Sequence, residues 1–450
     1  MLEAENNLQT YDIYPKVVPV GRPVTFTLRA MDPDVLRGAV THIDVLAIDG
    51  ATDKVNTPLF PNVETTPLEA PQQGFCFTLT LPSEQEYQVH LVFEETGAKR
   101  PRAVLSVYAL EDDLLQRKPL VGDFHAHTFF SDGREGPAFV AAHYRQNGFD
   151  FATITDHRRM PPSYRAIAAL DGLDIPFKMY PGEEVHPHNS YVHIINFASD
   201  VSVNAYALAD QTEEGFRNTD PTPEWNEELE RVAASLNDLP EGVDRLETAR
   251  SIITARRIKE GGGLAVLAHP HWRCRVHNVP DAMDEYFWQH GVFDALELIN
   301  GQGWAENASQ ISLYNEWRAK GRQVPVVAGS DEHSVLWSSR SKPVHFTEER
   351  AVVFAEENSR EAIIKAVKEL RSTVVIKIID QNPQIVGGGY RLELYTLFLL
   401  QNYFPLRDEL YFEEGRLLHE YIAGTPGAKE RLEATVRANA YFEDKYICRA

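Results

Sequence analysis

The stretch PLVGDFHAHTFFSDG, residues 119–133, decides the fold, because an alternation of strands and helices begins with it. Its short apolar run predicts a strand, and Gly136 and Pro137 then open a helix that Gly148 ends. Further apolar strands alternate with helices at 243–259 and 308–320; these strands are expected at 149–157, 177–185, 190–197, 263–271, 293–300 and 324–333. This alternation predicts an α/β fold with a parallel sheet closed or nearly closed into a barrel.

Histidines mark the ends of these strands. Five of them follow an apolar strand at its C-terminal end: His125, His127, His157, His269 and His333. In a βα-barrel those ends converge on one face, which carries the active site. His125 and His127 point the same way because alternate strand residues share a side, and the same holds for Asp331 and His333. Imidazole and carboxylate are ligands for zinc, manganese and iron, so the pattern predicts a metal site.

The two ends of the chain follow other patterns. Residues 1–118 are expected to form a β-sandwich-like accessory domain, because short β-branched segments alternate with turn residues; these segments lie at 23–30, 42–48, 75–81, 87–93 and 103–110. A polar insertion at about 200–245 interrupts the catalytic part, and its TDPTPEWNEELE portion shows no clear core face. Residues 381–450 have helical spacing and are expected to form a helical C-terminal extension.

Composition limits the classes of function. The formal charge of -22 argues against nucleic-acid binding, which needs a basic face. Three cysteines far apart suggest no disulfide framework. The N-terminus does not resemble a signal peptide, and no apolar run approaches the roughly 20 residues of a spanning helix. The expectation is a cytoplasmic enzyme without a membrane partner, whose oligomeric state the sequence leaves open.

Six motifs in order resemble the polymerase and histidinol phosphatase (PHP) superfamily: GDFHAHTFFSDG (122–133), TITDH (153–157), PGEEV (181–185), HIINF (193–197), LAVLAHP (264–270) and AGSDEH (328–333). The resemblance implies a distorted (β/α)7 barrel over 119–380, the accessory domain and the extension lying outside it. It also implies a trinuclear centre, with two to three divalent ions (Zn, Mn or Fe) as cofactors.

The resemblance implies nine metal ligands: His125, His127, Asp132, His157, Glu184, His193, His269, Asp331 and His333. Glu184 matches the G-x-E pattern as the bridging carboxylate, and Glu183 is the alternative. Asp331 and His333 could also move protons as catalytic residues. Glu297, Asn300 and His271 end neighbouring strands and are candidates to support the ligands, while His186 and His188 are candidates for the rim.

Hydrolysis by a metal-activated hydroxide is the chemistry that such a centre implies. An anionic small-molecule substrate would need an arginine beside the metals. Arg158 is taken as the catalytic candidate, and four more arginines lie within a few residues of a ligand motif: Arg134, Arg159, Arg273 and Arg340.

Three functions remain open. The first is a phosphoesterase acting on a small phosphorylated molecule, which an arginine beside the metals favours. The second is a metal-dependent amide or ester hydrolase of the carbamate type, which an apolar pocket would favour. The third is a non-catalytic metal-binding PHP module in an assembly. The complete ligand set argues against this third function. A replicative polymerase is excluded because nothing outside the PHP-like region could hold a polymerase domain.

Overall fold

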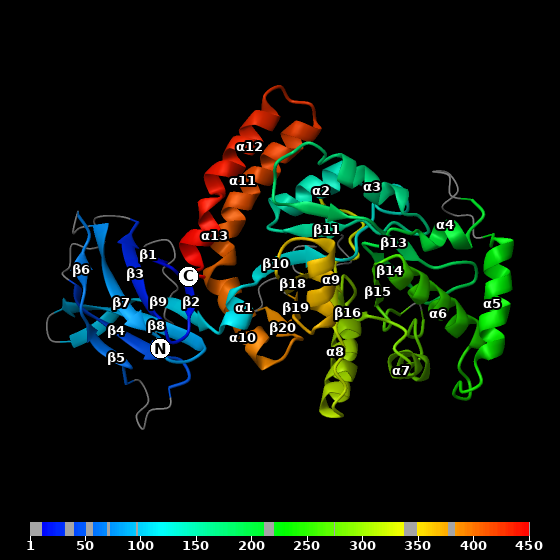
Figure 1. Cartoon of the computed structure of the whole chain (residues 1–450), viewed down its shortest axis with the longest axis horizontal. Coiled ribbons are helices and arrows are strands. Elements are labelled where there is room, and N and C mark those ends of the chain that lie inside the picture. The colour runs from blue at the N-terminus through cyan, green and yellow to red at the C-terminus, as the bar shows by residue number, and fades with distance from the viewer. Residues whose placement is uncertain are drawn as a thin grey trace. The chain divides into compact units, whose positions relative to one another are not determined.

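The protein is described by a computed structural model that covers residues 11–31, 40–50, 57–69, 73–95, 98–210, 220–273, 275–336, 349–376 and 383–449. The chain forms two compact units (Figure 1). The first contains Met1–Arg117, Leu394–Glu409 and Arg437–Ala450, and the second contains Lys118–Glu393 and Leu410–Val436. Each unit is built around a hydrophobic core of its own.

Two sheets form the first unit. One has the order β1-β3-β7-β6 and consists of β1 (Tyr11–Tyr14), β3 (Pro23–Ala30), β7 (Gly74–Thr80) and β6 (Thr66–Pro67). The other has the order β2-β9-β8-β4-β5 and consists of β2 (Val17–Pro19), β9 (Ala98–Leu110), β8 (Gln85–Glu95), β4 (Val40–Ala47) and β5 (Phe60–Val63). In β3, Phe26 and Leu28 are buried while Thr25 and Arg29 are exposed, as expected for a strand with one buried face. Residues from both sheets pack into one core.

Four helices follow near the C-terminus: α10 (Tyr390–Asn402), α11 (Phe404–Ile422), α12 (Ala428–Asn439) and α13 (Tyr441–Tyr446). Their residues are divided between the units. In the first unit the Tyr446 hydroxyl donates to Asp12 Oδ1 at 3.0 Å, and the Cys448 N–H donates to the Val17 carbonyl at 2.9 Å. In the second unit the guanidinium of Arg145 donates from Nε to Glu414 Oε2 at 2.9 Å. The C-terminal segment therefore contributes contacts to each unit.

The second unit contains two mixed sheets. The first has the order β12-β11-β10-β18-β19-β20, made of β10 (Lys118–Asp123), β11 (Phe151–Thr153), β12 (Lys178–Tyr180), β18 (Glu349–Ala355), β19 (Ser372–Ile376) and β20 (Gln384–Val386). The second has the order β13-β14-β15-β16-β17, made of β13 (Gly182–Val185), β14 (Ile194–Phe197), β15 (Leu264–Leu267), β16 (Ala295–Asn300) and β17 (Val326–Gly329).

The predicted parallel sheet is found only in part, because both sheets are mixed. Strands β10 to β12 and β15 to β17 pair in parallel, but β14 is antiparallel to both of its neighbours, and β18 is antiparallel to β10 and β19. The chain between β13 and β14 holds no crossover helix, and a connection this short returns the next strand in the opposite direction. Within the described ranges the strands form two sheets rather than a closed barrel, linked by isolated bridges that pair Ala126 with Glu332 and His157 with Glu184.

Helices surround these sheets: α2 (Pro137–Gln146), α3 (Pro161–Ala168), α4 (Val203–Ala207), α5 (Pro223–Ser235), α6 (Arg245–Glu260), α7 (Asp281–Gln289), α8 (Trp304–Ala319) and α9 (Arg360–Lys368); a short α1 (Asp112–Leu115) precedes β10. Helix α5 corrects the interpretation of the 200–245 insertion. Thr222 accepts a hydrogen bond from the Trp225 N–H at 3.1 Å, and Trp225, Leu229 and Val232 form a buried face. This face packs beside α6 (Figure 1).

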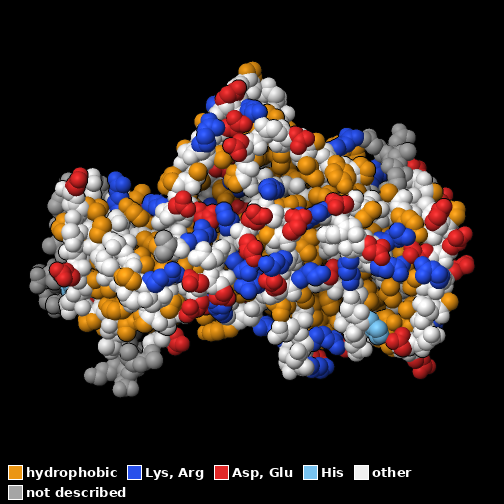
Figure 2. All heavy atoms as spheres, viewed as in Figure 1, with side chains coloured by type: hydrophobic (Ala, Val, Ile, Leu, Met, Phe, Trp, Pro, Cys, Tyr) orange, Lys and Arg blue, Asp and Glu red, His pale blue; other side chains and the backbone are white. Residues whose placement is uncertain are grey.

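On the face of the molecule seen in Figure 2, acidic and basic side chains are interspersed among apolar ones. None of the helices in the described part of the chain combines the length and the apolarity needed to cross a membrane.

Candidate metal centre

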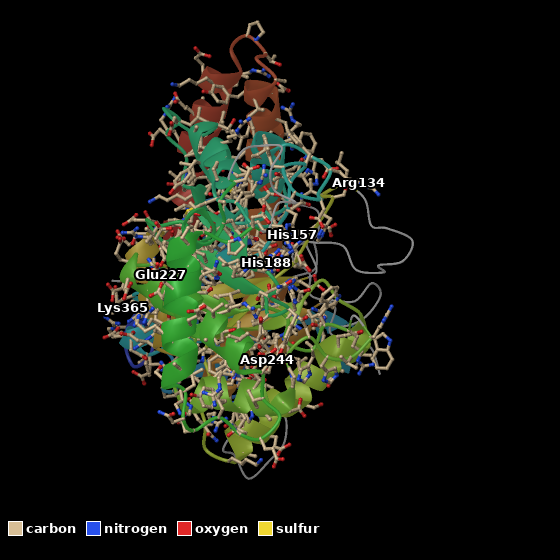
Figure 3. All side chains as sticks on the ribbon, turned by 90° about the vertical axis from the view of Figure 1, so that its right-hand side faces the viewer. Arg134, His157, His188, Glu227, Asp244 and Lys365 are labelled. Carbon is tan, nitrogen blue, oxygen red and sulfur yellow. The ribbon has the colours of Figure 1, made fainter. Side chains whose placement is uncertain are left out.

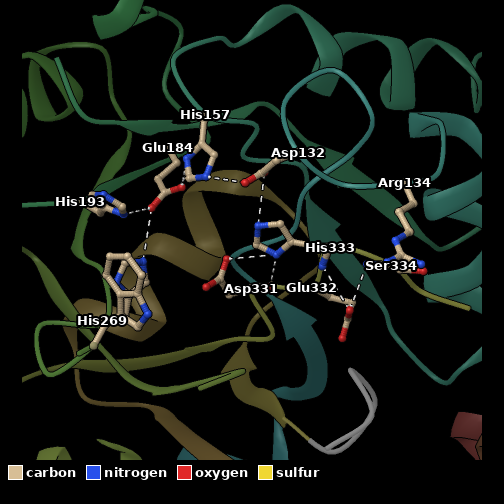
Figure 4. Close-up of a pocket in the computed structure, with 11 residues that line it drawn as sticks. Asp132, Arg134, His157, Glu184, His193, His269, Asp331, Glu332, His333 and Ser334 are labelled. Atoms are coloured by element: carbon tan, nitrogen blue, oxygen red, sulfur yellow. Dashed lines mark hydrogen bonds and ion pairs between the residues drawn. The ribbon is translucent and has the colours of Figure 1, made fainter. Parts of the chain in front are cut away.

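A cavity of about 430 Å³ opens where the two sheets of the second unit carry their histidines. It is lined by Asp132, Arg134, His157, Glu184, His193, His269, Trp272, Asp331, Glu332, His333 and Ser334 (Figure 4). Most of these residues follow the C-terminal end of a strand, whereas His193 precedes β14. Because β14 runs antiparallel to β13 and β15, its N-terminal end lies at the edge where their C-terminal ends lie.

The first group of ligand atoms surrounds Asp331. Its Oδ1 lies 3.0 Å from His127 Nε2 and 3.4 Å from His125 Nε2. Glu184 Oε2 lies 3.5 Å from His127 Nε2 and 3.6 Å from His125 Nε2. The two imidazole nitrogens are 3.1 Å apart, and both histidines are buried.

Glu184 also faces a second group. Its Oε1 lies 2.7 Å from His193 Nδ1 and 3.3 Å from His269 Nε2. The adjacent Glu183 faces the opposite way, as alternate strand residues do. It accepts hydrogen bonds from Asn196 Nδ2 at 3.0 Å, the Ser202 hydroxyl at 2.7 Å and Asn204 Nδ2 at 3.0 Å. Of the two carboxylates, Glu184 is therefore the one beside the histidines.

The third group is centred on Asp132. Its Oδ2 lies 3.4 Å from His157 Nε2, and its Oδ1 lies 3.3 Å from His333 Nε2. His333 Nδ1 donates to the Asp331 carbonyl at 2.8 Å, because a carbonyl only accepts. This hydrogen bond leaves the lone pair of His333 on Nε2, the atom that faces Asp132.

The spacing of these atoms fits divalent cations. Two ligand atoms bound about 2.0–2.2 Å from a tetrahedral zinc ion lie roughly 3.3–3.6 Å apart. Six of the separations above fall in this range, whereas the Asp331–His127 and Glu184–His193 separations are shorter, at 3.0 and 2.7 Å. Glu184 Oε2 lies 2.5 Å from His157 Nδ1 and His193 Nδ1 lies 2.7 Å from Glu184 Oε1, yet neither buried atom makes a well-aligned hydrogen bond with a described residue. Buried polar atoms without such partners are costly unless something else satisfies them. The clusters of His, Asp and Glu thus fit divalent metal binding.

Electrostatics in the cluster keeps the carboxylates ionised. Burial alone would raise the pKa of Glu184, but His157, His193 and His125 hold it well below its usual value. Burial alone would also lower the pKa of His157, yet Glu184 and Asp132 raise it to about 10. Burial together with His157 and His333 lowers the pKa of His127 to about 3. Without metal, the site therefore holds ionised carboxylates beside a charged imidazole at His157 and a neutral one at His127.

Glu297 in β16 supports two of these histidines. Its Oε1 lies 2.9 Å from the ring nitrogen Nδ1 of His125, and its Oε2 accepts hydrogen bonds from the backbone N–H of His269 and from Asn300 Nδ2, both at 2.9 Å. A carboxylate on the second ring nitrogen fixes the tautomer and orientation of a ligating histidine. Glu297 and Asn300 thus occupy the supporting positions that the sequence indicates.

His186 is placed differently from the nine predicted ligands. It is buried, and its Nε2 lies 2.8 Å from His157 Nδ1. This distance suits a hydrogen bond, although His157, Glu184 and His186 also lie close enough together to hold a cation. His271 is buried too, but its Nδ1 lies 3.1 Å from the Ser309 hydroxyl, and it is not among the residues that line the cavity.

Among the predicted arginines, Arg134 lines the cavity and Arg158 does not. Arg158 instead donates from Nε to the His186 carbonyl at 3.3 Å. Arg159 is buried, Arg273 is exposed and neither lines the cavity, and Arg340 lies outside the described residues. Figure 3 shows Arg134 and His157 toward the same side of the unit, away from Glu227 in α5 and Lys365 in α9. Among the predicted arginines in the described part of the chain, Arg134 is therefore the one that lines the cavity.

Three lining residues were absent from the sequence interpretation: Trp272, Glu332 and Ser334. Trp272 directly follows AHPH, and Glu332 and Ser334 flank His333. Their position next to a ligand motif was the only feature of the sequence that could have identified them. Backbone geometry marks the same places. His269 and Asp331 have positive φ angles of 27° and 49°, and such conformations in residues other than glycine cluster at functional sites.

Comparison with protein-family models finds no match, and comparison with curated proteins finds none. Among solved structures, the chain is similar to a two-domain protein from Bacteroides vulgatus described as containing a predicted PHP-like metal-dependent phosphoesterase, with 17% identity and a TM-score of 0.38. That match covers 58% of this chain and 65% of the other.

Two further solved structures are similar. A protein from Bifidobacterium adolescentis described as a metal-dependent phosphoesterase shares 20% identity with a TM-score of 0.33, over 47% of this chain and 87% of the other. An amidohydrolase from Chromobacterium violaceum, solved with bound sulfate and no metal, shares 19% identity with a TM-score of 0.30, over the same shares of the two chains. The structural neighbours of this chain thus include PHP-like metal-dependent phosphoesterases, at low identity and over part of its length.

Proposed function

We propose that this chain is a metal-dependent hydrolase that cleaves a phosphate ester of a small molecule. The observation that supports this most is the position of Glu184, whose two oxygens face histidines from different groups across one cavity. A carboxylate so placed suits a bridge between two cations, which is the arrangement of many two-metal phosphoesterases.

We assign three sets of residues to cation binding. His125, His127, Glu184 and Asp331 form the first, Glu184, His193 and His269 the second, and Asp132, His157 and His333 the third. Divalent ions held there would supply polarisation of the phosphoryl oxygens and a lower pKa for water. Asp331 and His333, also predicted as catalytic residues, have their lone pairs directed into the ligand groups, so we give them the ligand role. We also propose that the two mixed sheets correspond to the distorted PHP-type barrel.

Arg134 is our candidate for holding the substrate's negative charge. Arg134 lines the cavity together with Asp132 and Ser334 (Figure 4). Arginine suits phosphate oxygens because its fork of N–H donors matches their geometry. An amide or carbamate substrate would not need this charge, and for that reason the phosphoesterase is preferred.

An amide or ester hydrolase remains the second candidate, because Trp272 gives the cavity one apolar wall. A screen separates the two functions. The full-length protein is reconstituted with zinc, manganese or iron and assayed against phosphate monoesters, phosphodiesters, amides and carboxylic esters. We expect hydrolysis of phosphate esters that disappears with chelator. Turnover confined to amides or carboxylic esters would replace our proposal with the second candidate.

Two arginine variants make the screen specific. We expect Arg134→Ala to raise KM for the phosphate ester about 10- to 100-fold, the effect of losing a charge-assisted hydrogen bond. Arg158→Ala is the matched control, because Arg158 donates to the His186 carbonyl outside the cavity wall. A larger KM effect at Arg158 would return anion binding to the residue that the sequence favoured.

A further inference from the structure

An indole forms one side of the cavity. Trp272 lines the cavity with 37% of its surface exposed, and its ring centroid lies 5.8 Å from that of His193 and 5.9 Å from that of His269. Both histidines face Glu184 Oε1, so Trp272 lies beside one end of the ligand cluster. The other described lining residues are polar or charged, which makes this indole the apolar surface available to a bound molecule.

The backbone holds Trp272 in place on both sides. Its N–H donates to the His269 carbonyl at 2.9 Å, and its carbonyl accepts from the Asn278 N–H at 2.8 Å. An isolated antiparallel β-bridge pairs the backbones of Arg273 and His277 in the same turn. The backbone that carries the indole is therefore ordered before any ligand arrives, and a side chain on an ordered backbone loses less entropy on binding than one on a mobile loop.

The charged end of the cavity lies elsewhere. In Figure 4, Arg134 lies beyond Asp132 and His333, on the side opposite His193 and His269. The cavity volume of about 430 Å³ falls within the range of pockets that enclose small organic ligands. A substrate can thus place an anionic group near the ligand cluster and Arg134 while a second, apolar group reaches the indole.

We infer that Trp272 determines specificity for phosphate esters of flat aromatic alcohols, with the ring of the alcohol stacked on the indole. This inference rests on the proposed phosphoesterase function. In the reaction, the oxygen of water bonds to phosphorus, the bond between phosphorus and the ring-bearing oxygen breaks, and the aromatic alcohol leaves with a proton from that water. Offset stacking of two aromatic rings is favourable beyond the area that it buries, so a ring gains affinity here that an alkyl group does not.

Equilibrium binding tests this without turnover. Phenylphosphonate and methylphosphonate, which cannot be hydrolysed as esters, are titrated into metal-loaded full-length protein. We expect Trp272→Leu to weaken phenylphosphonate binding about tenfold and to leave methylphosphonate binding unchanged. Trp272→Phe should restore most of the loss because it keeps an aromatic ring. Trp304→Leu is the control, since Trp304 is 73% exposed in α8 and does not line the cavity.

Steady-state assays with phenyl phosphate and glycerol phosphate complete the test. We expect Trp272→Leu to lower kcat/KM for phenyl phosphate about tenfold relative to glycerol phosphate. Equal changes for both ligands, or none, would overturn the role of Trp272. Ring-selective phosphonate binding that depends on Trp272, without turnover of any phosphate ester, would refute the phosphoesterase while supporting the aromatic subsite. Failure of both phosphonates to bind the unaltered protein would overturn both.

Discussion

Glu184 is the residue on which the candidate metal centre depends most, because each of its oxygens faces at least one histidine. Glu184→Gln keeps the shape of the side chain but removes the negative charge that two cations would share. We expect this variant to lose at least one metal ion per chain and nearly all turnover. Elemental analysis of protein prepared without chelator, beside the activity assay, measures both.

Glu183→Gln is the matched control. Glu183 is buried and accepts hydrogen bonds from Asn196, Ser202 and Asn204, away from the histidines. We expect the variant to keep its metals and to lose about 1–3 kcal/mol of unfolding free energy, because an amide cannot accept all of these bonds. Metal loss confined to Glu183→Gln would move the bridge to Glu183.

His186 is expected to orient a ligand. His157 Nδ1 lies 2.5 Å from Glu184 Oε2 and 2.8 Å from His186 Nε2. When His157 binds a cation through Nε2 and Glu184 Oε2 binds one as well, His186 Nε2 is the acceptor left for the proton on Nδ1. We predict that His186→Phe weakens metal affinity about 10- to 100-fold, the usual cost of removing such a partner. His186→Gln keeps an acceptor oxygen and should be milder. Metal competition with a chromogenic chelator measures the affinity, and equal losses in both variants would contradict a hydrogen-bonding role.

Metal binding should release protons. In the metal-free protein, burial alone lowers the pKa of His157, but Glu184 and Asp132 outweigh it and raise that pKa to about 10, so His157 is protonated at pH 7. A cation has to displace this proton, and metal affinity should therefore rise as pH increases toward that value. Calorimetric titration in buffers of different ionisation enthalpy counts the released protons. Binding that releases none at pH 7 would contradict the charge state described here.

At the scale of elements, strand β17 packs against the ligands through Gly329. A Cβ at this position would lie 2.0 Å from Glu297 Oε1 and 2.4 Å from His125 Cβ. We expect Gly329→Ala to displace one of these groups, costing about 1–3 kcal/mol of stability and lowering metal affinity. Thermal unfolding and metal titration check both effects. Gly303→Ala is the control, because its Cβ would meet the flexible end of Glu306.

Elements differ in how well the sequence predicts them. The bounds of β3 (Pro23–Ala30) agree with the sequence, since alternation of apolar and polar residues marks a strand with one exposed face. Helix α5 was missed because its buried face consists of a few residues among many charges, and burial becomes visible only where α6 packs on it. The directions of β14 and β18 depend on hydrogen bonding to strands that are distant in sequence, which no local pattern encodes.

At the scale of the whole molecule, the division into two units predicts a selective effect of metal removal. All nine predicted ligands lie between residues 125 and 333, within the second unit. A ligand present at 1,000 times its dissociation constant stabilises the state it binds by about 4.1 kcal/mol. We expect calorimetry of the full chain to show a chelator-sensitive transition for the second unit and an insensitive one for the first. Equal shifts of both transitions would indicate that the units unfold together.

The sequence by itself determined which side chains could form the centre, because ligand chemistry belongs to residue types and the period of a strand places His125 beside His127. It also indicated a supporting role for Glu297. Only the tertiary structure decided what required distances: that Glu184 faces the histidines and Glu183 does not, that Arg134 lines the cavity and Arg158 does not, and that Trp272 forms its apolar wall. These outcomes depend on how loops from separate strands meet, and packing between residues far apart in the chain sets that geometry.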